Sequence, residues 1–174
     1  MNIDKIIILG KSASGKDYLL NKLCSRKLKK SVSYTSRPMR DGEVDGVTYN
    51  YISKDEFKQM IYDNKFIEYH NFNGWYYGNT IDDFENSDVF IKTVYGLNQL
   101  KVYRDRCFIV YIDMPREVRE ERLLGRSDSN DSIKRRMDAD DVDFKNFHDY
   151  DLYISDPNYD VEYICDSILE IVGK

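Results

Sequence analysis

The chain has 174 residues, of which 41% are hydrophobic and 33% are charged, a composition typical of a folded globular domain. The formal net charge of -5 argues against a protein that binds duplex nucleic acid, because that function needs a dense basic face. No apolar run approaches the roughly 20 residues that a membrane span needs. We therefore expect a cytoplasmic protein that contacts neither nucleic acid nor a membrane.

Strand-like and helix-like segments alternate from the first residues onward. The apolar run 5–9 predicts a buried strand, and the spacing of Leu20, Leu23 and Leu28 predicts a helix from residue 16 to about residue 28. A strand followed by a glycine and then a helix is the start of a βα unit.

The later segments continue this alternation. Ser53 and Glu56 have the spacing of a capping box and begin a helix that we expect to run to about residue 64. Three further apolar runs predict strands, each followed by helical spacing, at residues 88–93, 106–113 and 150–155. Asp160 is the expected N-cap of the last helix.

Interleaved strands and helices predict an α/β fold, with a parallel sheet flanked by helices and ligands at the carboxyl ends of the strands. Two segments interrupt this pattern. Residues 33–86 are rich in Pro, Gly and Tyr and predict an inserted lobe of mixed α/β structure, and the Ser, Asp and Arg-rich residues 124–135 predict a mobile loop. We expect one domain, 1–174, made of a core (1–32, 87–123 and 137–174), the lobe (33–86) and a short mobile lid (124–136).

The segment GKSASGKD lies between the first strand and the first helix and matches the GxxxxGK pattern of a phosphate-binding P-loop. Glycines let the backbone wrap around phosphate, while N–H groups and the helix N-terminus point at the anion. The residues expected to bind ATP are Gly10, Lys11, Ser12, Ala13, Ser14, Gly15, Lys16 and Asp17. Lys16 would contact the β and γ oxygens. Asp17 stands where the pattern has Ser or Thr, and its carboxylate either binds Mg²⁺ or caps the helix; the sequence leaves both open.

Arg37 and Arg40 lie three residues apart in a loop that contains a proline, and two guanidinium groups there suit a dianionic phosphate. Tyr49 and Tyr77 are candidate hydroxyl donors to the same phosphate. From the spacing alone, surface arginines in a turn remain an alternative.

The stretch SYTSRPMRDGEVDGVTYNYIS, residues 33–53, closely resembles the nucleotide-monophosphate-binding segment of the guanylate kinase family. GWYYGNT, residues 74–80, matches the same family, and with the P-loop the resemblance spans nearly the whole chain. It implies a P-loop NTPase fold in which the lobe binds the acceptor nucleotide. It also implies ATP-dependent phosphorylation of GMP or dGMP with Mg²⁺, and we expect a monomer or a weak homodimer.

The resemblance also assigns residues to the acceptor nucleotide. The full set implied for GMP is Ser33, Arg37, Arg40, Tyr49, Glu68, Tyr77, Gly78, Asn79 and Thr93, with Ser33, the two arginines and the two tyrosines on the phosphate. Glu68 matches the carboxylate that reads guanine, because one carboxylate can accept from both N1–H and the amino group. Asn79 replaces a hydroxyl residue of the family and can still donate through its amide. Thr93 replaces an acidic residue, which removes an acceptor near the guanine amino group.

Arg122, Arg126, Arg135 and Arg136 cluster around the Ser and Asp-rich loop, and such a run alone is typical of a solvated helix face. The resemblance favours Arg126 and Arg136 as lid arginines that reach the ATP phosphates, with Arg135 facing solvent. A GMP phosphate oxygen is already anionic, so transfer needs charge stabilisation and no general base. The residues expected to carry catalysis are Lys16, Arg37, Arg126 and Arg136.

Two other functions remain open at this stage, and a third, a regulatory NTPase, is disfavoured because no separate switch or effector region is evident within the 174 residues. The changes at Asn79 and Thr93 suggest a kinase of the same fold with broader base choice. Some guanylate-kinase-like modules bind proteins without catalysis, although they commonly lose the P-loop lysine, which is present here as Lys16. Asp113 resembles a Walker B acid at the end of a strand, but Pro115 also fits a simple turn into a helix, and we expect a loop residue.

Overall fold

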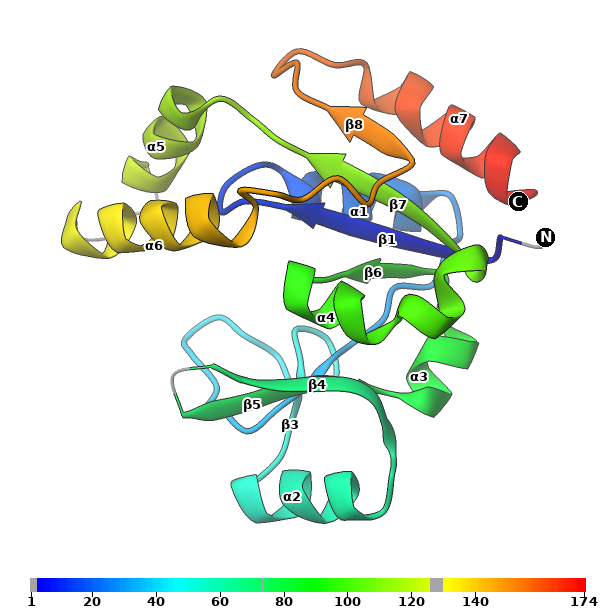
Figure 1. Ribbon diagram of the computed structural model, residues 1–174, viewed down its shortest axis with the longest axis vertical. Coiled ribbons are helices and arrows are strands. Elements are labelled where there is room, and N and C mark those ends of the chain that lie inside the picture. The colour runs from blue at the N-terminus through cyan, green and yellow to red at the C-terminus, as the bar shows by residue number, and fades with distance from the viewer. Residues whose placement is uncertain (1–2, 73, 126–129) are drawn as a thin grey trace.

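The computed structural model of the protein describes residues 3–72, 74–125 and 130–174, with the backbone alone for residues 130–132 (Figure 1). Within these residues the larger sheet has four parallel strands in the order β6-β1-β7-β8. They are β6 (Val89–Ile91), β1 (Lys5–Gly10), β7 (Cys107–Ile112) and β8 (Leu152–Ile154). The predicted parallel sheet is confirmed, although its last three strands are one or two residues shorter at each end than expected.

Alternate residues of β1 enter two cores on the two faces of this sheet. Ile6 and Ile8 pack in one core with residues of α1 and α7, whereas Ile7 and Leu9 pack in the other with residues of α3 and α4. Figure 1 shows α7 and α4 on opposite sides of the sheet. The four helices are α1 (Lys16–Ser25), α3 (Ile81–Asn86), α4 (Val94–Gln99) and α7 (Val161–Val172). Because both faces are covered, every residue of β1 is buried, which explains its unbroken apolar run.

Two helices follow β7 and lie beside the end of β1 that carries Gly10 (Figure 1): α5 (Arg116–Leu124) and α6 (Asn130–Asp143). The prediction of a loop over residues 124–135 is wrong for its second half, because α6 begins at Asn130. Ile133 and Met137 are four residues apart, so they lie on one face of α6 and are buried against Leu123 of α5. This small apolar cluster stabilises helical structure in a segment whose composition is polar.

The smaller sheet comes entirely from within residues 33–86 and, in the described part of the chain, has the strand order β3-β2-β5-β4. Its strands are β2 (Tyr34–Thr35), β3 (Asn50–Tyr51), β4 (Phe66–Phe72) and β5 (Trp75–Thr80). The β2–β3 pair is parallel and the other two pairs are antiparallel. This mixed sheet agrees with the mixed α/β structure that was expected for the inserted lobe.

The helix α2 (Lys54–Tyr62) covers this sheet through Phe57, whose ring stacks on Phe66 and Tyr76 at centroid distances of 4.3 and 5.2 Å. The capping box predicted at its start is confirmed: Ser53 Oγ accepts from Glu56 N–H, and Glu56 Oε2 accepts from Ser53 N–H. A short 3-10 helix, η1 (Lys101–Arg106), precedes β7. No helix among the described residues is long and apolar enough to cross a membrane.

Candidate active site

The predicted P-loop joins the end of β1 to the start of α1. A Cβ atom at Gly10 would lie 2.5 Å from both Ile112 O and Ser14 Oγ, so only glycine allows this close packing. Ala13 and Gly15 have positive φ angles of 59° and 100°, and residues in this conformation turn successive N–H groups toward a common centre. The loop therefore has the backbone geometry of an anion-binding site.

Lys16 lies at the first position of α1, and its Nζ donates to Gly10 O at 2.7 Å and to Lys11 O at 2.9 Å. The ammonium group is thus folded back over the loop. Asp17 follows in the first turn of the same helix and is exposed.

The acidic end of α6 reaches the P-loop. Ser12 N–H donates to Asp140 Oδ2 at 2.7 Å, and Lys11 forms ion pairs with Asp113 at 3.3 Å and Asp141 at 3.4 Å. Asp113 lies in the loop after β7, as expected, where it also accepts from the Tyr153 hydroxyl. Carboxylates therefore already contact the loop on the side of α6.

Arg37 is the most buried of the candidate phosphate-binding residues on the lobe, with 8% of the residue exposed. Its Nη1 and Nη2 donate to the two carboxylate oxygens of Glu43 at 2.9 and 2.8 Å. Glu43 also accepts from Arg40 N–H and from the Tyr51 hydroxyl, each at 2.7 Å. These hydrogen bonds, above all the one from Arg37, lower the pKa of Glu43 to about 2 and raise the pKa of Arg37.

Glu43 was not predicted as a functional residue. The available signal was an acidic residue in the same short loop as two arginines, and that signal is weak because Arg40 is the nearer of the two in sequence. The Arg40 side chain is exposed, and only its backbone N–H contacts Glu43.

Tyr49 and Tyr77 lie beside Arg37. Their ring centroids are 6.0 Å apart in an edge-to-face arrangement, and the Arg37 guanidinium carbon lies 5.5 Å from the Tyr49 ring. The pKa of Tyr49 is raised, mainly by burial, and the negative charge of Asp17 contributes to that rise.

The base end of the predicted site is a buried polar cluster. Glu68 on β4 is 3% exposed and its Oε1 accepts from Lys92 Nζ at 2.6 Å. Lys92 Nζ also donates to Asn79 Oδ1, which accepts from Ser33 Oγ at 2.9 Å. The structure thus joins Ser33, Glu68 and Asn79 through Lys92, a residue that was not predicted. The signal available in the sequence was a lysine directly after the apolar run of β6.

Gly78 and Thr93 have structural contacts in the same region. A Cβ atom at Gly78 would lie 2.7 Å from Glu68 O, so a side chain there would collide with the neighbouring strand β4. Thr93 is exposed and its Oγ1 accepts from Gly96 N–H at 3.0 Å, which makes it the N-cap of α4.

The predicted lid arginines are only partly placed. Arg126 lies outside the described residues. Arg136 lies on α6 and is exposed, as is its neighbour Arg135, in agreement with the expectation that Arg135 faces solvent. Arg122 on α5 donates from Nη1 to Ala13 O of the P-loop at 3.0 Å.

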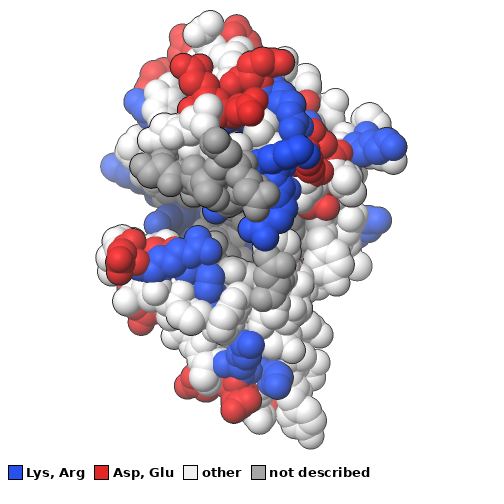
Figure 2. Space-filling view, turned by 90° about the vertical axis from the view of Figure 1, so that its left-hand side faces the viewer, with Lys and Arg blue, Asp and Glu red and all other residues white. Residues whose placement is uncertain are grey.

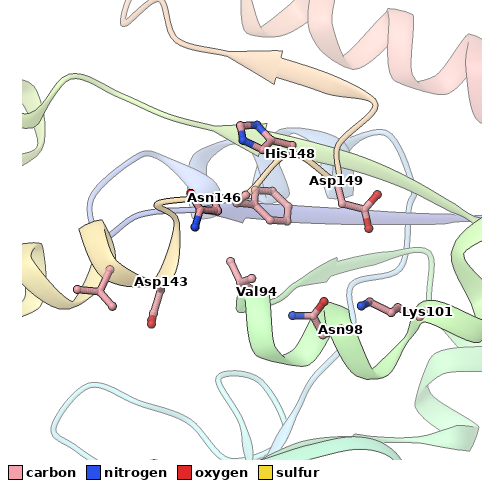
Figure 3. Close-up of a pocket in the computed structure, with 9 residues that line it drawn as sticks. Val94, Asn98, Lys101, Asp143, Asn146, His148 and Asp149 are labelled. Atoms are coloured by element: carbon pink, nitrogen blue, oxygen red, sulfur yellow. The ribbon is translucent and has the colours of Figure 1, made fainter.

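Figure 2 shows the face of the molecule toward which the P-loop end of β1 points, where Lys and Arg side chains lie interspersed with Asp and Glu over both the core and the smaller sheet. A separate open recess of about 510 Å³ lies between α4, the end of α6 and residues 146–149 (Figure 3). Its lining in the described part of the chain contains none of the predicted nucleotide-binding residues.

A family model described as guanylate kinase matches residues 2–174 of the chain. The chain belongs to the guanylate kinase family. It is 34% identical over 167 residues to the guanylate kinase of Histophilus somni (strain 129Pt), covering 88% of this chain and 80% of that protein. It is 33% identical over 178 residues to the guanylate kinase of Bacillus subtilis (strain 168), with 96% and 86% covered.

The crystal structure of guanylate kinase from Anaplasma phagocytophilum is similar in fold, with a TM-score of 0.72 at 23% identity, covering 99% of this chain and 86% of that one. The predicted family and the P-loop NTPase fold are thereby confirmed. As a member of the guanylate kinase family, the chain is a nucleoside monophosphate kinase, a phosphotransferase whose acceptor is itself a phosphate group.

Proposed function

We propose that this member of the guanylate kinase family transfers the γ-phosphate of ATP to GMP or dGMP. The observation that supports it best is the match of a family model described as guanylate kinase to residues 2–174 of the chain. Direct transfer would require the P-loop and the acceptor side chains of the lobe to lie on the two sides of one space. The P-loop would bind ATP, and Glu68 would accept from N1–H of the guanine base.

The acceptor phosphate would be bound by Arg37 and the two tyrosines beside it, Tyr49 and Tyr77, with Ser33 and Arg40 assigned to it from the family pattern. The Glu43 carboxylate accepts from Nη1 and Nη2 of Arg37 and so orients the guanidinium plane, and the N–H groups of Arg37 that Glu43 and Pro38 O do not use would donate to the phosphate. The phosphate-binding group in this proposal is Ser33, Arg37, Arg40, Tyr49 and Tyr77. An oriented cationic site lowers the repulsion between two anionic nucleotides, which is the main obstacle to transfer.

Lys16 and the lid arginines would stabilise charge on the transferred group. The Lys16 ammonium lies against the P-loop backbone, where the β and γ phosphates of ATP would bind. Arg136 would reach the same phosphates from α6, and Arg126 is proposed for this role from the family pattern.

Asp17 would hold Mg²⁺ together with the ATP phosphates. Mg²⁺ is usually bound through one or two carboxylates plus substrate phosphates, and Asp17 is an exposed carboxylate one residue after Lys16. Among the described residues no three His, Cys, Asp or Glu side chains gather into a separate metal site. When bound, Mg²⁺ supplies charge neutralisation on the phosphate oxygens. We further propose that the enzyme acts in the cytoplasm as a monomer or a weak homodimer, and that it does not bind nucleic acid, because its formal net charge is -5.

A coupled assay that follows ADP formation tests this function with a panel of acceptors at fixed ATP and Mg²⁺. We expect GMP and dGMP to be phosphorylated and AMP, CMP and dTMP to be poor acceptors. A protein that consumes no ATP with any acceptor would favour a silent protein-binding module. Equal activity with AMP, CMP or dTMP would overturn the guanine-reading role of Glu68.

The variant Lys16→Ala tests the chemistry at the P-loop. We expect kcat to fall at least about 100-fold, because a positive charge at the developing negative charge is lost, while GMP binding measured by calorimetry changes little. Lys58→Ala, on the exposed side of α2, is the matched control and should retain full activity. A Lys16→Ala protein with normal turnover would contradict the proposed mechanism.

A further inference from the structure

Lys92 is a buried cation at the base end of the proposed acceptor site. Its side chain and that of Glu68 are each 4% exposed, and the two form an ion pair at 2.6 Å. The two opposite charges lie against each other away from water, where either one alone would be strongly disfavoured. A nucleobase that contacted the Glu68 carboxylate would therefore lie next to the Lys92 ammonium group as well.

The hydrogen bonds of this cluster leave one hydrogen of Lys92 unused. An ammonium group has three hydrogens. One goes to Glu68 Oε1 and one to Asn79 Oδ1, and the described residues offer no third acceptor. The remaining hydrogen is available to an acceptor atom on a ligand.

Asn79, in contrast, has no amide hydrogen left for a ligand. Its Nδ2 donates to Ser31 Oγ and to Asp83 Oδ2, and the residue is 1% exposed. The opposite amide orientation would place the NH₂ group against the Lys92 ammonium and the carbonyl oxygen against the Asp83 carboxylate, so the surrounding charges fix the orientation. The hydrogen-bond donor of this site is thus Lys92 and not Asn79.

The carboxylate of Glu68 is also partly used. Oε1 accepts from Lys92, and Oε2 faces the first turn of α4, where a Cβ atom at Gly96 would lie 3.0 Å away. The nearby Thr93 has no carboxylate, and its hydroxyl oxygen accepts from Gly96 N–H. The cluster therefore offers one ammonium donor next to one carboxylate acceptor, with no second carboxylate for an exocyclic amino group.

We propose that Lys92 is a specificity-determining residue that donates to the 6-carbonyl oxygen of a purine, while Glu68 accepts from the adjacent N1–H. This inference rests on the proposed function and deepens it by naming the substrate class: 6-oxopurine nucleoside monophosphates, with hypoxanthine accepted nearly as well as guanine. The two bases share the carbonyl and N1–H and differ only at the 2-amino group, for which this cluster has no dedicated acceptor. Adenine in the same pose places an amino group against the ammonium and a bare ring nitrogen against the carboxylate.

Purified wild-type protein tests the inference through kcat/KM for GMP, IMP, AMP and dTMP with ATP and Mg²⁺. We expect the value for IMP to lie within about tenfold of that for GMP, and the value for AMP to be lower by about 10⁴ or more. dTMP shares the carbonyl and N–H pair on a smaller ring and is expected to be a poor acceptor. If GMP is phosphorylated but kcat/KM for IMP is more than 100-fold lower than for GMP, this inference is overturned. The proposed function would then still stand. Failure of both GMP and IMP would overturn the proposed function itself.

The variant Lys92→Met removes the donor at similar side-chain length and frees both oxygens of Glu68 for N1–H and the 2-amino group of guanine. We expect the IMP to GMP ratio of kcat/KM to fall at least tenfold, whereas a purely structural role for Lys92 would lower both values equally. Lys58→Met on α2 is the control and should keep the wild-type ratio. A folded Lys92→Met protein with an unchanged ratio would overturn the inference, and if the variant does not fold, the wild-type ratio still decides.

Discussion

A single carboxylate, that of Glu43, holds the guanidinium group of Arg37 in one orientation. It accepts hydrogen bonds from the Arg37 guanidinium, from Arg40 N–H and from the Tyr51 hydroxyl. Three donors from one loop and a neighbouring strand restrict both the carboxylate and the arginine. If Arg37 binds the acceptor phosphate as proposed, we expect Glu43 to act through Arg37 as a positioning residue without touching the substrate.

The acid sensitivity of this ion pair gives a prediction. The pKa of Glu43 is about 2 in the folded protein and near 4.5 without the partners, so the stabilisation is complete above pH 4.5 and is lost as the pH falls toward 2. We expect Glu43→Gln to lower the free energy of unfolding at pH 7 by about 1 to 3 kcal/mol, since hydrogen bonds to a charged group are lost. Urea unfolding of both proteins at several pH values should show their stabilities converging below pH 3.

Glu120→Gln, at an exposed position of α5, is the control and should follow the wild-type pH dependence. A constant difference between wild type and Glu43→Gln from pH 7 to pH 2.5 would contradict the assigned role of the carboxylate.

The two residues that sequence reasoning missed share a physical cause. Arg37 and Glu68 stand in segments whose local pattern matches a family, and so they were predicted. The proposed role of Lys92 depends on its contact with Glu68, which lies 24 positions away on β4. The proposed role of Glu43 depends on its contact with Arg37, which forms only when the loop folds back. A single sequence shows residue types and short spacings. It does not show which charged side chains come into contact in the folded protein.

At the scale of the elements, the segments with strong local signals were predicted and those with weak signals were not. β1 has an unbroken apolar run, and α7 has both an Asp160 cap and a continuous apolar face. The first half of α6 contains one apolar residue among polar ones, so its helix became visible only through the packing of Ile133 and Met137 against Leu123. Tertiary contacts decide the structure of such a segment.

The capping box predicted from the sequence at the start of α2 can be tested by mutation. Ser53→Ala removes the hydrogen bond from Glu56 N–H and should lower the free energy of unfolding by about 1 kcal/mol. Because α2 carries Phe57 onto the smaller sheet, hydrogen exchange should increase first in α2. Ser53→Asp preserves a capping oxygen and should retain most of the stability, and an equal loss in the two variants would show that capping is not the cause.

At the scale of the whole molecule, three parts of the chain converge on the P-loop. The core supplies the loop itself, α5 places Arg122 against Ala13 O, and α6 places Asp140 and Asp141 next to the loop. Asp140 Oδ2 accepts from Ser12 N–H, one of the backbone donors of the loop. A carboxylate in that position carries the same sign of charge as the phosphates of the nucleotide.

The expected consequence is that Asp140 weakens ATP binding. Asp140→Asn preserves the size of the side chain but removes the charge, so we expect KM for ATP at saturating GMP to fall about threefold to tenfold, with a smaller change in kcat. This range corresponds to roughly 1 kcal/mol of like-charge repulsion at a distance of a few ångströms in a solvated site. The difference should shrink only in part in high salt, because the Asp140 side chain is 18% exposed and partly buried charges are screened less than exposed ones.

Asp138→Asn is the matched control for this prediction, since Asp138 lies on the same helix and pairs with Arg116 and Lys134, neither of which belongs to the P-loop. Arg119 contacts both Asp140 and Asp141 at 3.6 Å, so it keeps one partner in Asp140→Asn, and thermal unfolding checks that the fold is intact. An unchanged or higher KM for ATP in a folded Asp140→Asn protein would show that the carboxylate supports the loop. In that case α6 would support ATP binding by holding the P-loop in place. The hydrogen bond from Ser12 N–H to Asp140 would then matter more than the repulsion between the Asp140 carboxylate and the ATP phosphates.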